Sequence, residues 1–299
     1  MTKRVLSLHH ILGSTFAFET QLALLPFYKL NQREIILLDS GFASTDRQVL
    51  TDTLQAYDFS VRGILCSHAH MDHAGNIGHL CSIYGCRVAA HQYEAATAAP
   101  DSDLRQFGIH ASSKHGVEEC FTTTDVILPE QTTLDFCGAV FGILHLPGHS
   151  PGHLGYVTPD GVAYLGDALM GFSQLEGSKM PFTSRLADDL NSKRSLLNLR
   201  AEAYVAAHKA IVTDICPLAR ANIACLETKV EEIFQILQGT PTALEWLTAY
   251  CRQKGWTFRT ERSFSILSFG FNSAVDYLEE TGRVASRTVG GSRRFIRRS

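Results

Sequence analysis

The sequence lacks several features that would each assign the protein to a particular class. It contains no apolar run approaching the roughly 18 residues that a membrane-spanning helix needs, so we expect no such helix. Its basic start, MTKRVLSLHHILGS, has only scattered apolar residues, which argues against a signal peptide and favours a cytoplasmic location. The eight cysteines include no C-x-x-C pair, and a chain of 299 residues needs no disulfides to be stable.

The composition is that of a globular protein. Hydrophobic residues make up 45% of the chain and charged residues 19%, and the length allows one large domain or two ordinary ones. The net charge of −3 says little, but its distribution is uneven. Residues 282–299 contain no acid and six arginines, at positions 283, 287, 293, 294, 297 and 298.

The pattern of predicted helices and strands changes near residue 215. Before it, strand-like runs alternate with helical patterns at 45–57, 76–84 and 187–200, which predicts an α/β domain over residues 1–215. After it come helical patterns at 226–237, 242–252 and 271–280, then two strand-like runs separated by Gly290 and Gly291. We therefore expect residues 216–299 to form a small winged-helix-like domain.

The stretch SHAHMDHAGN, residues 67–76, concentrates metal-binding side chains at the end of an apolar strand. His68 and His70 are two positions apart, so their side chains can point the same way, whereas Asp72 and His73 lie on the following turn and approach from another direction. Four ligands from one loop suit two ions better than one. Each pair stays incomplete until distant residues contribute, because a zinc site needs three or four ligands.

Three later positions supply candidates for those ligands. His149 lies in the glycine- and proline-rich loop PGHSPGH after an apolar run, Asp167 ends the run YLGD, and His208 ends the run AYVAAH. Taken in order, HAHMDH, PGH, GD and a strand-terminal histidine, with LLDSG upstream, resemble the metallo-β-lactamase superfamily over about residues 5–215. The match is to its glyoxalase II-like, small-hydrolase branch, some members of which carry a C-terminal winged-helix-like module.

This resemblance implies an αβ/βα sandwich: two mixed sheets packed face to face, helices outside, and metals in a cleft at one edge. It also implies a ligand set. One metal would be bound by His68, His70 and His149, the other by Asp72, His73 and His208, with Asp167 bridging. Asp39 of LLDSG would support the ligands from behind, and His153 would support them, touch substrate or cap its loop. His208 departs from the usual pattern, because Lys209 follows it instead of glycine.

The expected chemistry is hydrolysis at a dinuclear centre. Two divalent ions can share a water and lower its pKa, giving a hydroxide that attacks a carbonyl carbon or a phosphorus, and Asp72 would both ligate and orient it. Zinc is the first choice of metal, and manganese and iron are the alternatives. No G-x-S-x-G is present. In the diiron oxidoreductase branch a glutamate usually occupies the position of His70, which argues against redox chemistry here.

Three functions stay open from the sequence. The first is a hydrolase of a small ester, thioester or related acyl compound. The second is an endoribonuclease or phosphodiesterase that holds nucleic acid with its arginine-rich C-terminal module. The third is a regulatory protein that docks DNA. We expect residues 92–125 to shape the rim of the cleft, but they do not specify the substrate, and nothing in the sequence sets the oligomeric state.

Overall fold

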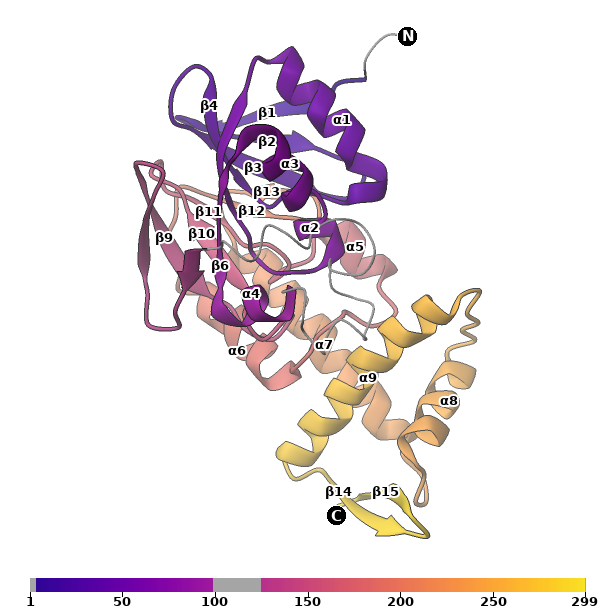
Figure 1. Cartoon of the computed structure of the whole chain (residues 1–299). Coiled ribbons are helices and arrows are strands. Elements are labelled where there is room, and N and C mark those ends of the chain that lie inside the picture. Colours follow the sequence, from indigo (N-terminus) through magenta and orange to yellow (C-terminus); the bar gives the residue numbers. More distant parts are fainter. Residues whose placement is uncertain (1–3, 99–124, 299) are drawn as a thin grey trace.

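The computed structural model describes residues 4–98 and 125–298, so most of the predicted rim segment lies outside the described residues. Two mixed sheets pack face to face (Figure 1). The first has seven strands, in spatial order β1 (Ser7–Leu12), β2 (Thr15–Glu19), β3 (Leu24–Lys29), β4 (Glu34–Leu38), β5 (Ser60–Leu65), β6 (Arg87–His91) and β7 (Asp125–Ile127). The second has six, in order β13 (Ala210–Val212), β12 (Ala203–Ala206), β11 (Val162–Tyr164), β10 (Leu154–Val157), β9 (Ala139–His145) and β8 (Thr133–Phe136).

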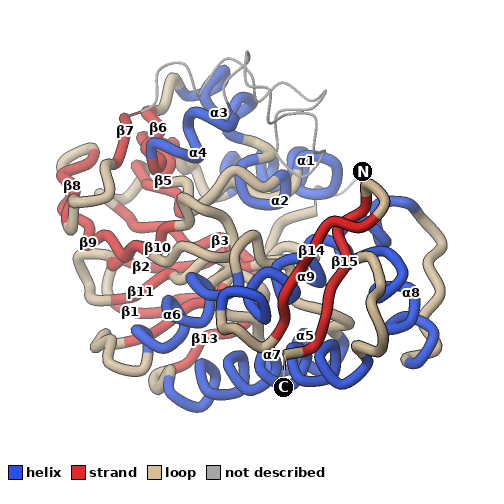
Figure 2. The backbone as a smooth tube through the Cα atoms, turned by 90° about the horizontal axis from the view of Figure 1, so that it is seen from below, coloured by secondary structure: helices blue, strands red, loops and turns tan. Residues whose placement is uncertain are grey.

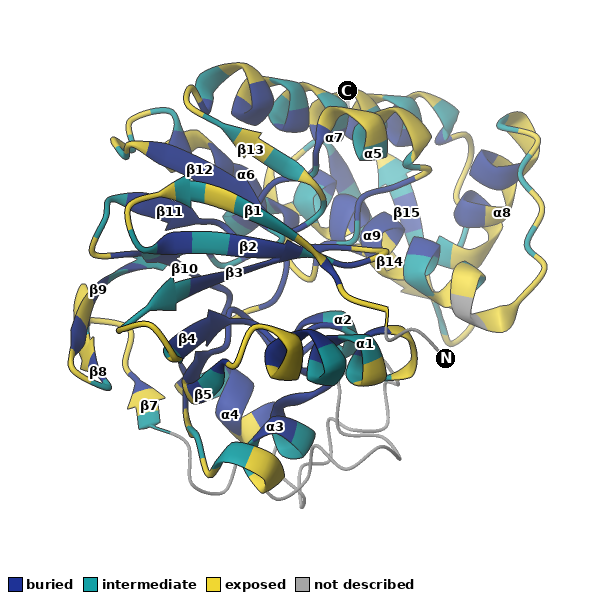
Figure 3. Cartoon of the chain, turned by 90° about the horizontal axis from the view of Figure 1, so that it is seen from above, coloured by how far each residue is buried: buried dark blue, intermediate teal, exposed yellow. Residues whose placement is uncertain are grey.

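Helices cover the outer face of each sheet. The first half of the chain supplies α1 (Ala43–Ala56), α2 (Met71–Ala74), α3 (Ile77–Tyr84) and α4 (Gln92–Ala98), and the second half supplies α5 (Phe172–Gly177), α6 (Leu186–Leu196) and α7 (Cys216–Ile236). In Figure 3, α1 and α3 lie on one side of the sheets and α6 and α7 on the other. The predicted αβ/βα sandwich is therefore confirmed. No described helix is both long and apolar enough to span a membrane.

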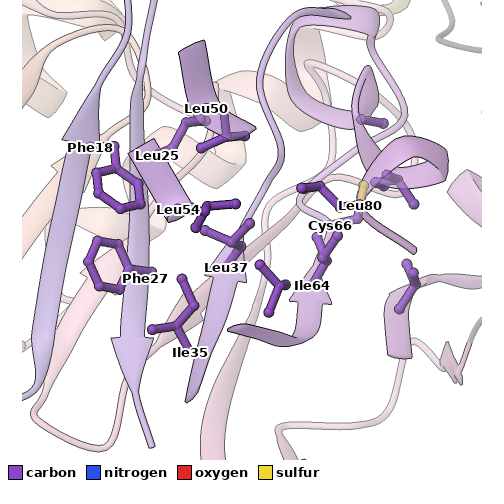
Figure 4. Packing of buried hydrophobic residues seen from close by; sticks show 14 of the residues in the cluster. Phe18, Leu25, Phe27, Ile35, Leu37, Leu50, Leu54, Ile64, Cys66 and Leu80 are labelled. Carbon is purple, nitrogen blue, oxygen red and sulfur yellow. The ribbon is translucent and has the colours of Figure 1, made fainter. Parts of the chain in front are cut away.

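Strand β4 illustrates how the sequence builds these layers. Successive side chains of a strand point to opposite faces, and its residues 35–38 are all fully buried. Ile35 and Leu37 pack with Leu50 and Leu54 of α1 (Figure 4). Ile36 and Leu38 belong to the cluster between the two sheets, with residues such as Phe141. A continuous apolar run is thus needed here, because both faces of the strand are covered.

The C-terminal region contains the predicted three helices and hairpin. Helix α7 is followed by α8 (Ala243–Gln253), α9 (Glu261–Glu280), β14 (Val284–Val289) and β15 (Ser292–Arg297). The hairpin lies against α8 and α9 (Figure 2). Gly290 and Gly291 both have positive φ, at 57° and 77°, the conformation that a two-residue hairpin turn requires.

Two of these helices begin earlier than predicted. Helix α7 starts ten residues before position 226, with Pro217 in its first turn, where the missing N–H costs nothing. Helix α9 starts ten residues before position 271, where the side chain of Thr260 accepts from the backbone N–H of Ser263. Leu218 of α7 packs with residues of the six-stranded sheet, whereas the C-terminal half of α7 packs with α8 and α9. The domain boundary at 215/216 and the winged-helix likeness stay predictions.

Candidate metal centre

All seven predicted ligands lie together at one edge of the sandwich, where strands of both sheets end. The loop after β5 brings four of them, and the segments after β9, β11 and β12 bring His149, Asp167 and His208. Donor atoms within 4.8 Å of one another form three groups: His68, His70 and His149; His68, His73 and Asp167; and Asp72, His73 and His208. The ligands converge because they follow neighbouring strands, and the loops after neighbouring strands can meet at one edge of the sandwich.

The first group consists of three buried imidazoles. His149 Nε2 lies 2.9 Å from His70 Nδ1, and the two rings are in contact with that of His68. His68 Nε2 is buried and has no hydrogen-bond partner among the described residues. Buried polar atoms normally have partners, so three nitrogens converging on one point indicate a position for a cation.

Asp167 lies between the first group, His68, His70 and His149, and the third, Asp72, His73 and His208. Its Oδ1 is 3.2 Å from His73 Nε2 and 3.3 Å from His208 Nε2, while its Oδ2 is 3.4 Å from His149 Nε2. Asp72 is farther out, with Oδ2 3.8 Å from both His73 Nε2 and His208 Nε2. One carboxylate thus faces nitrogens of both groups, the arrangement that a bridging ligand needs.

Four of the imidazoles are oriented by a contact at the nitrogen that faces away from the centre. Such contacts fix the tautomer and the ring orientation of metal-binding histidines. The pairs are His68 Nδ1 with Ser67 Oγ at 2.9 Å, His73 Nδ1 with Asp39 Oδ2 at 2.8 Å, His149 Nδ1 with the Phe182 carbonyl at 3.2 Å, and His208 Nδ1 with the Leu22 carbonyl at 3.1 Å. The other nitrogen of each ring is left for the centre.

Asp39 is fully buried behind the ligands, as predicted for a supporting residue. Its carboxylate accepts from the backbone N–H and the hydroxyl of Ser67, both at 2.6 Å, and from the Tyr164 hydroxyl and His73 Nδ1. The backbone of Asp39 has φ 68°, a conformation that aspartate tolerates better than most residues. These contacts let one carboxylate position two ligand histidines, one directly and one through Ser67.

His153 supports Asp167 through the backbone. Its Nε2 accepts from the Asp167 N–H at 3.0 Å. The approach is close: a Cβ at Gly166 would lie 2.7 Å from the same nitrogen, so only glycine fits there. The predicted supporting role of His153 thus has a contact that can carry it.

Burial and charge divide the histidines into two electrostatic classes. Burial lowers the pKa of His68 well below its usual value and that of His149 to about 3. The pKa of His73 is raised well above its usual value, because Asp167 and Asp72 outweigh the opposing effect of burial. Asp167 likewise raises the pKa of His208 to about 9. The first class is neutral, as metal ligands must be, and the second holds protons that a cation would displace.

Glu94, which was not predicted as a site residue, joins the two main ligand loops. This fully buried carboxylate accepts from the Ala69 N–H at 2.8 Å, between His68 and His70. It also accepts from the Ser150 hydroxyl at 2.7 Å and the Gly152 N–H at 3.0 Å, on the loop of His149. No motif marks Glu94, which follows β6 on the short helix α4, so only the tertiary structure identifies it.

The residues present fit divalent cations. Buried atoms without hydrogen-bond partners among the described residues are His68 Nε2, His73 Nε2, Asp167 Oδ1 and His153 Nδ1, and the first three face the centre. Five imidazoles and two carboxylates are a donor set that suits borderline ions such as zinc. These residues could therefore hold two ions, one in the first group and one in the third.

Comparisons with known proteins match the chain to one protein family. Residues 28–208 match the family profile described as "Metallo-beta-lactamase superfamily". The chain is 30% identical over 139 residues to a hydroxyacylglutathione hydrolase of Shewanella sp. (strain ANA-3), and 27% identical over 172 residues to one of Shewanella baltica (strain OS223). These alignments cover 46% and 58% of this chain and 45% and 55% of the relatives, so the chain spans about half the length of the curated relatives it matches.

Solved structures resemble the chain over nearly its whole length. A metallo-beta-lactamase family protein from Thermus thermophilus has a TM-score of 0.66 at 23% identity, covering 92% of this chain and 94% of that protein. A beta-lactamase domain protein from Burkholderia ambifaria has a TM-score of 0.70 at 15% identity, covering 98% and 94%. At these identities the likeness establishes the fold alone.

Proposed function

Because the chain belongs to the metallo-beta-lactamase superfamily, we propose that it is a hydrolase with two divalent metal ions and a small ester, thioester or related acyl substrate. The position of Asp167 carries the proposal. Its carboxylate faces His149 on one side and His73 and His208 on the other, so the two ligand groups form one centre. Zinc is the proposed metal.

Two divalent ions bound here would lower the pKa of a water to near neutrality and polarise the oxygen of the scissile carbonyl. The side chains would accept the proton of the water and keep the metal ligands in position. Asp72, whose side chain is 30% exposed, stands at the open side of the centre and can accept a proton from the attacking water. Asp39 and Ser67 hold His68 and His73 in one tautomer. The site thus combines rigid ligands with one accessible carboxylate.

The relatives support a small acyl substrate. Two curated proteins that the chain matches are hydroxyacylglutathione hydrolases, whose name denotes cleavage of an acyl group from glutathione. A cytoplasmic location stays a prediction. We retain the division into a catalytic unit, 1–215, and a winged-helix-like unit, 216–299, as part of the proposal.

The C-terminal arginines give the nuclease alternative little support. Arg283 and Arg293 form ion pairs with Glu231 and Glu279, and Arg294 lies 3.3 Å from Glu245. The Arg283 and Arg297 guanidinium groups also lie over the ring of Phe234, at 3.9 and 4.1 Å. Most of this charge is thus engaged within the module itself.

The test is a panel assay on the metal-loaded protein. Thioesters and lactones are offered in one arm and labelled single-stranded RNA in the other, with His149→Ala as the inactive variant and His10→Ala, at an exposed position, as the control. We expect turnover in the first arm that His149→Ala abolishes and His10→Ala preserves. RNA cleavage lost in His149→Ala, with no turnover of thioesters or lactones, would replace the proposal by the alternative.

A further inference from the structure

A small cavity of about 170 Å³ adjoins the metal centre and has no role in the chemistry described so far. One wall consists of the ligands His149, Asp167 and His208, and the opposite side is lined by residues of α6, α7 and the segment around Phe182. The cavity volume is far more than the roughly 10–15 Å³ that a single water needs, so the cavity can hold several waters. A short, flexible chain fits such a space, whereas a large ring system does not.

Most of the wall away from the ligands is apolar, formed by Met170, Pro181, Phe182 and Leu226. Two ionisable side chains interrupt it. Lys193 and Asp189, one helical turn apart on α6, form an ion pair with each other, and their exposed fractions are only 5% and 2%. A lysine this deeply buried is rare and needs partners for its ammonium group.

Asp189 satisfies only part of that need. An ammonium group has three N–H donors, and among the described residues the single hydrogen bond of Lys193 Nζ goes to Asp189 Oδ1. Since both side chains line the cavity, the remaining donors can reach a group within it. An acceptor inside the cavity would therefore remove a desolvation cost that the protein otherwise bears.

The ammonium group favours an anionic acceptor over a neutral one. Lys193 and Asp189 cancel each other, so the pair adds no net charge to the cavity. Two divalent cations would carry four positive charges, which offset the three negative charges of Asp39, Asp72 and Asp167, so these carboxylates would not exclude an anion from the cavity. A carboxylate is also the strongest acceptor available to an ammonium group.

We propose that Lys193 binds a carboxylate at the far end of the substrate's acyl group, so that the enzyme prefers acyl groups with a terminal carboxylate over those ending in a methyl group. The inference rests on the proposed function, since it assigns the cavity to the acyl chain whose carbonyl lies at the centre. Asp189 accepts one hydrogen bond of the ammonium and, as a second carboxylate, competes with the substrate for it, and the apolar walls take the methylene groups.

The test compares three thioesters of one small thiol: glutaryl, 5-hydroxypentanoyl and hexanoyl. We expect kcat/KM for the glutaryl compound to exceed that for the hexanoyl compound by about 10- to 100-fold, the value of a hydrogen bond to a charged group. In Lys193→Met this preference should disappear. Equal rates for the glutaryl and hexanoyl compounds in the unaltered protein would overturn the assignment, and a preference for the hydroxyl compound would replace the carboxylate by a neutral group.

Two further variants keep the test decisive. Arg194→Met removes a cation from the same helix, but Arg194 is exposed and pairs with Glu227, so the preference should be unchanged. Asp189→Asn frees the ammonium from its partner, so the preference should grow by about 3- to 10-fold. Even if Lys193→Met fails to fold, a preference that falls in Asp189→Asn would overturn the proposal.

Binding separates this inference from the proposed function. Calorimetry with the metal-loaded protein compares glutarate with pentanoate, which lacks the second carboxylate. If none of the thioesters is hydrolysed, yet glutarate binds at least 10-fold more tightly than pentanoate and Lys193→Met removes the difference, the function fails and the carboxylate site stands. If the thioesters are hydrolysed but glutarate and pentanoate bind equally well, the proposed function stands and the carboxylate site is overturned.

Discussion

Asp39 Oδ2 and His73 Nδ1 lie 2.8 Å apart, and neither side chain is more than 1% exposed. The contact leaves His73 Nε2 as the nitrogen that faces Asp167. Because Asp39 also accepts from both polar groups of Ser67, which in turn contacts His68 Nδ1, this single carboxylate orients ligands of both proposed metal positions. Asp39 is therefore the first position to test.

Replacing Asp39 by asparagine should weaken metal binding without removing a ligand. We expect a 10- to 100-fold loss of Zn²⁺ affinity, since the amide cannot hold the two histidines in the required tautomers. Competition with a chromophoric chelator measures it. Asp58→Asn is the matched control, because Asp58 is exposed and, within the part of the chain that the structure describes, its side chain pairs with Arg33 alone. Equal affinities in the two variants would show that Asp39 does not position the ligands.

Glu94 should matter for stability as well as for metal binding. Glu94→Ala leaves the donors of Ala69, Ser150 and Gly152 buried without their partner, and at about 1–3 kcal/mol each we expect a loss of at least about 3 kcal/mol in the free energy of unfolding. Glu94→Gln retains one carbonyl oxygen and should lose less. Urea unfolding of the metal-free protein measures both, with the exposed Glu130→Gln as control. Alanine and glutamine variants as stable as the control would contradict the role of Glu94.

Metal binding should release protons at neutral pH. In the metal-free protein the pKa of His208 is raised to about 9 and that of His73 is raised well above its usual value, so both are protonated at pH 7 and must lose a proton to bind a cation. The pKa values of His68 and His149 are lowered, and these residues release none. Calorimetry in two buffers of different ionisation enthalpy should detect the release at pH 7 and find it smaller above about pH 9. A release that His208→Ala leaves unchanged would contradict this assignment.

The C-terminal arginines should stabilise their own module. Arg283→Gln removes an exposed ion pair with Glu231 and the stacking over Phe234, and we expect a loss of about 0.5–1 kcal/mol in stability. Thermal unfolding measures it, and RNA affinity in a filter-binding assay should not change. Arg287→Gln, in the exposed part of β14, is the control. A large drop in RNA affinity with unchanged stability would revive the nuclease alternative.

The ligand set could be predicted because four motifs that follow apolar runs resemble the metallo-β-lactamase pattern, and neighbouring strand ends can meet at one edge of a sheet. The sequence could not reveal Glu94 or Lys193. Both are charged residues in helical segments, where an exposed position is the usual one, and only tertiary packing buries them. For the same reason the starts of α7 and α9 were missed, since Pro217 and Thr260 mark them through backbone geometry rather than through apolar periodicity.

The central claim, a dinuclear hydrolytic centre, is tested most directly by titrating the metal-free protein with Zn²⁺ while thioester hydrolysis is followed. We predict that activity reaches its maximum at two equivalents of bound metal, and that His208→Ala keeps the first equivalent but has less than about one-hundredth of the activity. Full activity at one equivalent, or turnover that persists in the metal-free protein, would contradict the account.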